Sequence, residues 1–138
     1  MVIDPSNAAS EYALPGSIAR YTLAVDNPGQ PVDGSSLVLV DQLPPNTHLV
    51  VDGPSAFSFT DGTVGSTLSF TWSGPASTTD DVDFSKDGVN WNYSPTATGS
   101  ANTDPSVTHL RFRPQGEFAP SIGVNEPSFE LHFTVQLE

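Results

Sequence analysis

Residues 128–136, SFELHFTVQ, carry the clearest alternation of apolar and polar side chains in the chain. Phe129, Leu131, Phe133 and Val135 take every second position, and the residues after them are polar or charged. Successive side chains of a β-strand point to opposite faces, so this pattern predicts a strand with one face in a core. A helix would scatter the same apolar residues around its circumference. This segment therefore indicates a β fold.

The same period of two recurs along the chain, and Pro, Gly, Asn and Asp interrupt it. In residues 17–27, SIARYTLAVDN, the side chains of Ala19, Tyr21, Leu23 and Val25 share a face. Residues 35–43, SSLVLVDQL, are apolar on both faces, which predicts a central strand covered on both sides. Further strands are expected in four segments: 47–53, 55–62, 66–72 and 107–114.

No stretch has the 3.6-residue apolar period of a helix. About eight strands at this spacing predict an antiparallel β-sandwich of immunoglobulin-like type, with a closed barrel as the alternative. There is no internal repeat, and 138 residues are about one domain. We therefore expect a single domain over 1–138 with its core at about 12–136, and we interpret Leu137-Glu138 as derived from a purification tag.

The composition excludes several classes of partner. The net charge is −12, from 16 acidic and four basic residues, so phosphate backbones and anionic lipid should repel the chain. We therefore expect no nucleic-acid partner. We also expect no membrane insertion, because no segment approaches the roughly 20 apolar residues of a span. Without cysteine there is no disulfide and no thiolate metal site. Only 14% of residues are charged, against about 25% in an ordinary domain. This composition is typical of extracellular β domains.

Residues 80–94, DDVDFSKDGVNWNYS, are the strongest candidate for a chemical site. An EF-hand loop starting at Asp81 would need Gly at its sixth position and Glu at its twelfth, and the chain has Lys86 and Asn92 there. That motif is excluded. Asp87-Gly88 instead predicts a two-residue hairpin with a type I′ turn.

In that hairpin Phe84 would face Trp91, and every apolar residue of both arms would fall on one face. The aspartates would be left on a polar, solvent-facing side. A calcium ion or a sugar on that side is the alternative interpretation, with Asp80, Asp81, Asp83 and Asn92 as candidate calcium ligands. Residues 94–106 form a Ser/Thr-rich loop that would serve as a second candidate binding region.

Other catalytic signals are weak. The three histidines, His48, His109 and His132, form no zinc-binding spacing. His109 and His132 are expected on outward faces of neighbouring strands, with Arg111 pairing with Glu130. No nucleophile elbow, phosphate loop or dinucleotide motif is present. Trp72 ends an alternating run and is interpreted as core, so no enzymatic activity, catalytic residue or cofactor is expected.

Residues 14–51 carry a recognisable succession of motifs. A Pro-Gly turn precedes a strand with Tyr21, an Asn27-Pro-Gly turn follows, and a second strand ends in Asp41 before Leu43-Pro44. This resembles the bacterial and archaeal conserved-repeat family called domain of unknown function eleven. The segments FSKDG, 84–88, and VTHLRF, 107–112, are also similar to its longer members. The resemblance is closest over 12–52 and looser to 135. The family often occurs as tandem copies, and one copy is present here.

The resemblance implies an immunoglobulin-like sandwich that serves as a spacer or adhesion module in exported, surface-attached proteins. Its partners would be neighbouring domains of the same parent chain and extracellular proteins or glycans, and the isolated domain would be a monomer. Tyr21, Asp41 and Leu43 would then pack the core and fix strand ends. The segment after Met1 lacks the features of a signal peptide, so we interpret the chain as an excised piece of a larger extracellular or cell-surface protein.

Overall fold

The computed structural model describes residues 2–3, 14–34, 37–54, 56–77 and 79–138. These residues contain nine strands and no helix, so none of them forms a helix able to span a membrane. The larger sheet has six strands: β1 (Val2–Ile3), β2 (Ile18–Asp26), β4 (Thr47–Val50), β5 (Phe57–Asp61), β7 (Thr103–Asp104) and β9 (Ser128–Leu137). The smaller sheet has three strands: β3 (Leu39–Gln42), β6 (Val82–Ser85) and β8 (His109–Phe112). All pairs of these strands are antiparallel.

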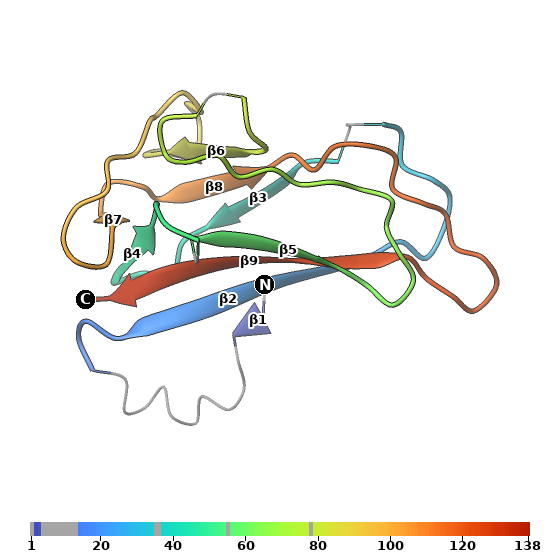
Figure 1. Cartoon of the computed structure of the whole chain (residues 1–138), viewed down its shortest axis with the longest axis horizontal. Helices are drawn as coiled ribbons and strands as arrows, with labels where there is room; N and C mark the ends of the chain where they lie inside the picture. Colours follow the sequence, from blue (N-terminus) through green and yellow to red (C-terminus); the bar gives the residue numbers. More distant parts are fainter. Residues whose placement is uncertain (1, 4–13, 35–36, 55, 78) are drawn as a thin grey trace.

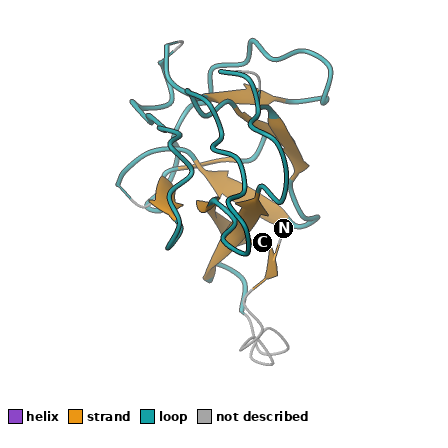
Figure 2. Cartoon of the chain, turned by 90° about the vertical axis from the view of Figure 1, so that its right-hand side faces the viewer, coloured by secondary structure: helices purple, strands orange, loops and turns teal. Residues whose placement is uncertain are grey.

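The sheets form two layers, with β6, β8 and β3 on one side and β9, β2 and β5 on the other (Figure 1). Long loops join the layers and account for much of the chain in the end-on view (Figure 2). The expected all-β sandwich is therefore confirmed. The expected start of the core, residues 12–13, lies outside the described residues. At the other end, Leu137 belongs to β9 and pairs with Thr47.

Strand β9 is the centre of the larger sheet. It pairs with β2 over nine positions, from Ile18 opposite Gln136 to Asp26 opposite Ser128. Along its other edge it pairs first with β5 and then with β4. The four apolar residues that alternate along β9 are at most 1% exposed, as the sequence predicts.

The core lies between the two sheets and is rich in aromatic rings. Phe112 of β8 is fully buried, and its ring centroid lies 6.0 Å from that of Phe57 and 6.4 Å from that of Phe133. Because β8 belongs to one sheet and β5 and β9 to the other, these contacts join the layers. Trp72 packs edge-on against Phe57 at 4.7 Å, which agrees with its predicted place in the core.

Two predictions about strands are wrong. Residues 39–42 form an edge strand, because among the described strands β3 pairs with β8 alone, and Val38 and Val40 are 48% and 58% exposed. The apolar run in that segment therefore reflects exposed valines and not burial on both faces. Residues 66–72 form no strand and contribute one bridge, between Ser69 and Gln115. Their apolar side chains still pack against the core.

Candidate functional site

The turn that follows β6 differs from the predicted hairpin. Phe84 lies opposite Tyr93, two residues beyond its predicted partner Trp91. Gly88 has a positive φ of 78°, but Asp87 does not, so the turn is not type I′. Val82 and Phe84 are buried in the core as predicted.

The side chains of the turn explain this longer path. The Oγ of Ser85 accepts hydrogen bonds from the amides of Asp87 and Gly88. The Oδ1 of Asp87 accepts from the amides of Val89 and Asn90, each at 2.8 Å. These bonds to the carboxylate hold the pKa of Asp87 far below its usual value. Side-chain acceptors thus replace the direct backbone closure of a two-residue turn.

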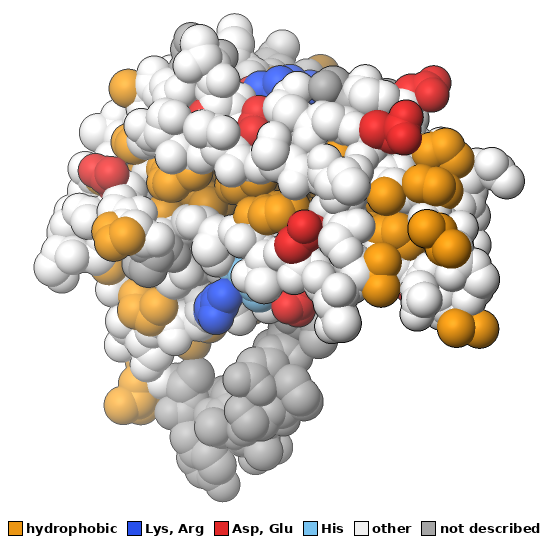
Figure 3. Space-filling view, turned by 45° about the vertical axis from the view of Figure 1, so that its right-hand side comes forward, with side chains coloured by type: hydrophobic (Ala, Val, Ile, Leu, Met, Phe, Trp, Pro, Cys, Tyr) orange, Lys and Arg blue, Asp and Glu red, His pale blue; other side chains and the backbone are white. Residues whose placement is uncertain are grey.

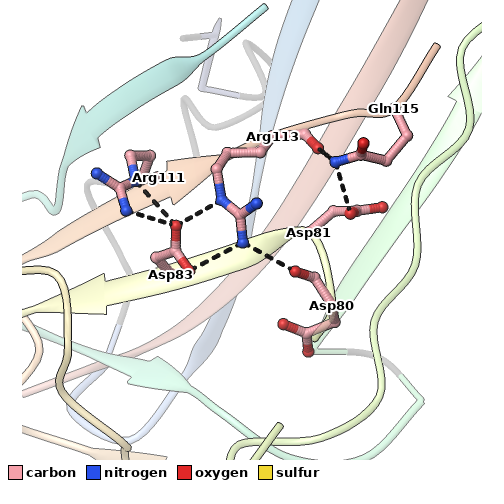
Figure 4. Close-up of polar contacts among 6 residues, drawn as sticks. All are labelled: Asp80, Asp81, Asp83, Arg111, Arg113 and Gln115. Carbon is pink, nitrogen blue, oxygen red and sulfur yellow. Dashed lines mark hydrogen bonds and ion pairs between the residues drawn. The ribbon is translucent and has the colours of Figure 1, made fainter. Parts of the chain in front are cut away.

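Asp83 is at the centre of an ion-pair network on the outer face of the smaller sheet (Figure 4). Arg111 lies directly opposite on β8, and its Nε and Nη2 donate to Oδ2 of Asp83 at 2.9 and 2.8 Å. Arg113 donates from Nε to Oδ2 at 2.6 Å and from Nη2 to Oδ1 at 3.1 Å. The hydrogen bond to Asp83 is the main cause of a raised pKa of Arg113. Two guanidinium groups therefore stand where a cation bound to Asp83 would lie.

Asp81 and Asp80 are buried, with 5% and 2% of their surface exposed, so the prediction that they face solvent is wrong. The carboxylate of Asp81 accepts from the amide of Thr71 at 2.8 Å and from Nε2 of Gln115 at 3.2 Å. These contacts fix the chain that enters β6 against two neighbouring segments.

Asp80 is less well satisfied. Its Oδ2 accepts from the amide of Ser73 at 3.2 Å, while its Oδ1 is buried without a hydrogen-bond partner among the described residues. Burial raises the pKa of Asp80, and the negative charges of Asp81 and Asp83 add to the rise. The amides of Ser73 and Val82 offset part of this rise. Asp80 is thus a carboxyl group whose ionised form is poorly stabilised.

Asn92 is not brought to the aspartates. It is exposed and lines a separate surface pocket with Lys86, Asp87, Asn90, Tyr93 and Ser94. Asp80 and Asp81 line another pocket, together with Thr71, Thr79, Arg113 and Gln115. Across the described part of the chain, no group of three or more His, Asp or Glu side chains is arranged to hold a metal ion.

The prediction that His109 and His132 lie on neighbouring strands is wrong. His109 belongs to β8 and His132 to β9, so the two residues lie in different sheets. The Nδ1 of His132 hydrogen-bonds to Oγ1 of Thr22 at 2.9 Å, and burial lowers the pKa of His132. His48 contacts Glu138 at 3.0 Å.

The predicted pairing of Arg111 with Glu130 is also wrong. Arg111 binds Asp83, whereas Glu130 lies on β9 between Ala24 and Thr60. The prediction assumed that the strands carrying the two residues are neighbours, and they belong to opposite sheets.

Two contacts were not foreseen from the sequence. The guanidinium carbon of Arg111 lies 4.8 Å from the ring centroid of Trp91, a cation–π geometry. Asp104, expected in an open loop, is 3% exposed and accepts from the hydroxyl of Tyr93 at 2.6 Å. For the second contact, the Asp-Pro pair at 104–105 indicates a turn at Asp104 but does not indicate its partner. No spacing in the sequence indicates the first contact, since it depends on strand order.

Comparisons with protein-family models, with curated proteins and with solved structures found no match to this chain. What the site can do therefore follows from its own chemistry. Among the sequence-predicted residues, Asp80, Asp81 and Asp83 lie together and Asn92 lies apart. The three carboxylates join β6 to β8 and to the preceding loop, which is a structural arrangement.

Proposed function

We propose that this chain is a non-catalytic structural or adhesive module, of immunoglobulin-like type, within a larger exported or cell-surface bacterial protein. The main support is that three carboxylates of the two candidate binding regions, residues 80–94 and 94–106, are used inside the domain. Asp83 is bound by two arginines, Asp81 by two donors and Asp104 by a tyrosine hydroxyl. Little of their hydrogen-bonding capacity is left for a substrate.

The acidic, cysteine-free composition agrees with such a module. The resemblance of residues 14–51 to the conserved-repeat family adds the expectation of neighbouring domains in the parent chain. Tyr21 and Leu43, two motif positions of that resemblance, are 6% and 8% exposed and belong to the core. Packing is therefore a sufficient role for both residues.

A binding module for calcium or carbohydrate is the second candidate. It is favoured by the surface pocket at Asn92, which amide, hydroxyl and charged side chains line together with Tyr93. Polar groups beside an aromatic ring suit a sugar, which has hydroxyl groups along its rim and apolar C–H faces. The ammonium of Lys86 lies 5.0 Å from the centroid of the Tyr93 ring, so a stacked sugar would have to displace it.

Thermal unfolding separates the two candidates. A ligand that binds only the native state must raise the melting temperature. We expect no shift with millimolar calcium, with a chelator or with a panel of neutral and acidic oligosaccharides. A calcium-dependent rise that disappears in Asp81→Asn, or a sugar-dependent rise that disappears in Asn92→Ala, would replace the module proposal by the binding one. Asp52→Asn, at an exposed loop position, is the matched control for charge.

A further inference from the structure

Strand β3 has one edge without a partner strand among the described residues. Within the described chain it pairs with β8 alone, from Leu39 opposite Phe112 to Gln42 opposite His109. In the same register the amide of Leu43 donates to the carbonyl of Thr108 at 2.9 Å. Backbone groups alternate in direction along an antiparallel strand, so Leu39 and Asp41 also bond to β8.

The backbone groups of Val40 therefore point away from the sheet, and those of Val38, the residue just before β3, do so if the same register is continued by one residue. Neither residue has a hydrogen bond to any part of the chain that the structure describes. The amide of the next outward residue, Gln42, is bound by the carboxylate of Asp41. The free edge thus offers two donor–acceptor pairs at a spacing of two residues, which is the pattern that an additional strand would match.

The side chains at this edge are apolar and exposed. Val38 and Val40 are 48% and 58% exposed, and residues 38–42 contain no Lys or Pro. Short length, an inward-pointing charge, lysine, proline and bulges all protect an edge strand against pairing with other chains, and β3 has only the first two of these, its four residues and Asp41. Among the other exposed apolar residues, Ile122, Val124 and Val89 lie outside the strands, as Val38 does, whereas Ile18 belongs to β2, which has partner strands on both sides. Several apolar patches are visible on the face in Figure 3, so exposure alone does not distinguish β3.

The charge near this edge differs from that of the whole chain. Residues 37–42 contain one charged side chain, Asp41, in a chain whose net charge is −12. The carboxyl of Asp41 has a buried Oδ2, and Val40 lies opposite the cationic Arg111 on β8. Because the cation of Arg111 is paired with Asp83, a neutral or weakly basic segment can approach here, and the acidic remainder of the surface attracts a basic one over longer distances.

We propose that β3 binds an extended peptide segment of a partner protein by strand addition. The segment would carry β-branched side chains at alternate positions and no net negative charge. Its backbone would pair with Val38 and Val40, and its side chains would cover the two valines. A second copy of this chain is disfavoured as the occupant, because each copy carries −12. This binding surface does not depend on the module role proposed above, because strand addition requires only the free edge.

The test uses the whole chain and the peptide acetyl-Lys-Val-Thr-Val-Thr-Val-Lys-amide. Amide hydrogen exchange followed by NMR reports on each backbone group separately. Without peptide, the amides of Val38 and Val40 should exchange quickly, and those of Leu39 and Asp41 slowly. With saturating peptide, exchange at Val38 and Val40 should slow by at least about tenfold, which is the scale of one backbone hydrogen bond.

Variants locate the binding. Val40→Pro removes one outward donor, and proline is tolerated on an edge strand whose N–H faces solvent. Val40→Lys keeps the donor but adds a cation that repels this peptide, so it tests the same edge should Val40→Pro unfold. Each folded variant should weaken peptide binding by at least about tenfold. Ile122→Lys, which changes another exposed apolar residue outside β3, should not weaken it.

Three results would overturn the proposal. The first is equal binding of a peptide methylated on alternate backbone nitrogens, because methylation blocks pairing but keeps the side chains. The second is the absence of new protection at Val38 and Val40 at the highest soluble peptide concentration. The third is protection of these amides that rises with protein concentration and accompanies dimers in sedimentation, since the occupant would then be a second copy.

Discussion

Asp80 and Asp81 are adjacent in the chain, and their carboxylates have different surroundings. Asp81 accepts a hydrogen bond on each oxygen, whereas Asp80 has one buried oxygen without a partner among the described residues. An ionised carboxylate that is buried and incompletely bonded lowers the stability of the native state. Removing the negative charge at these two positions should therefore have opposite effects on the free energy of unfolding.

We predict that Asp80→Asn raises the free energy of unfolding at pH 7, by up to about 1 kcal/mol. The asparagine oxygen can still accept from the amide of Ser73, and the side chain no longer places a charge beside Asp81 and Asp83. Asp81→Asn should lower the same free energy by about 1 kcal/mol, because the amide group of the new side chain would face a donor. Urea unfolding of both variants at one pH measures the contrast, and equal signs would contradict it.

The pH dependence of Asp80 has a defined sign. Its pKa in the folded chain is raised above 3.8, so between 3.8 and that raised pKa the native state binds more protons than the unfolded state. In this window the contribution of Asp80 to stability increases as the pH falls. Asp80→Asn should remove this contribution, and the difference in stability between the variant and the parent chain should shrink on acidification. A difference independent of pH from 7 to 3.8 would refute this assignment.

At the scale of elements, the turn after β6 depends on Gly88. Its φ is +78°, and a Cβ added there would lie 2.9 Å from Nε2 of His109. Gly88→Ala should therefore combine backbone strain of about 1 kcal/mol with a steric clash, and lower the free energy of unfolding by about 2 kcal/mol. Denaturant unfolding measures the loss.

Two further variants separate strain from clash. Gly99 has a φ of +72°, and a methyl group added there would meet only open space, so Gly99→Ala should show the strain alone. In a His109→Ala background, Gly88→Ala should lower the free energy of unfolding by no more than Gly99→Ala does. An unchanged cost in that background would mean that His109 is not the obstacle.

The sequence predicted elements well where one face is buried. The alternation in β9 and β2 predicted both strands and their inward faces, because a register shift of one residue would turn every apolar side chain away from the core. Prediction from the sequence failed where burial does not determine the order of apolar and polar residues. The exposed valines of β3 resembled a buried strand, and the turn after β6 follows hydrogen bonds of Ser85 and Asp87. The ion pairs of Asp83 could not be predicted, since they depend on which strand lies beside β6.

At the scale of the whole molecule, the order of the strands determines how the domain would bear load. Strands β2 and β9 are antiparallel, so the start of β2 and the end of β9 lie at the same end of the sandwich. The amide of Gly16 donates to the carbonyl of Leu137 at 2.7 Å, and the amide of Leu137 donates to the carbonyl of Ser17 at 2.8 Å. A force applied between these two segments would break the pairs of β2 with β9 one after another.

We therefore predict that resistance to force depends on the points of attachment. Because the chain has no cysteine, introduced thiols provide unique handles. Pro15→Cys with Glu138→Cys would peel β2 from β9, whereas Pro28→Cys with Glu138→Cys would shear all nine pairs at once. Single-molecule unfolding at one loading rate should give a clearly lower force for the first pair of handles than for the second. Equal forces would mean that another contact yields first. A low peeling force would mean that tension through these two segments opens the pairing of β2 with β9 in the larger sheet. The module would then suit an adhesive role better than a load-bearing one.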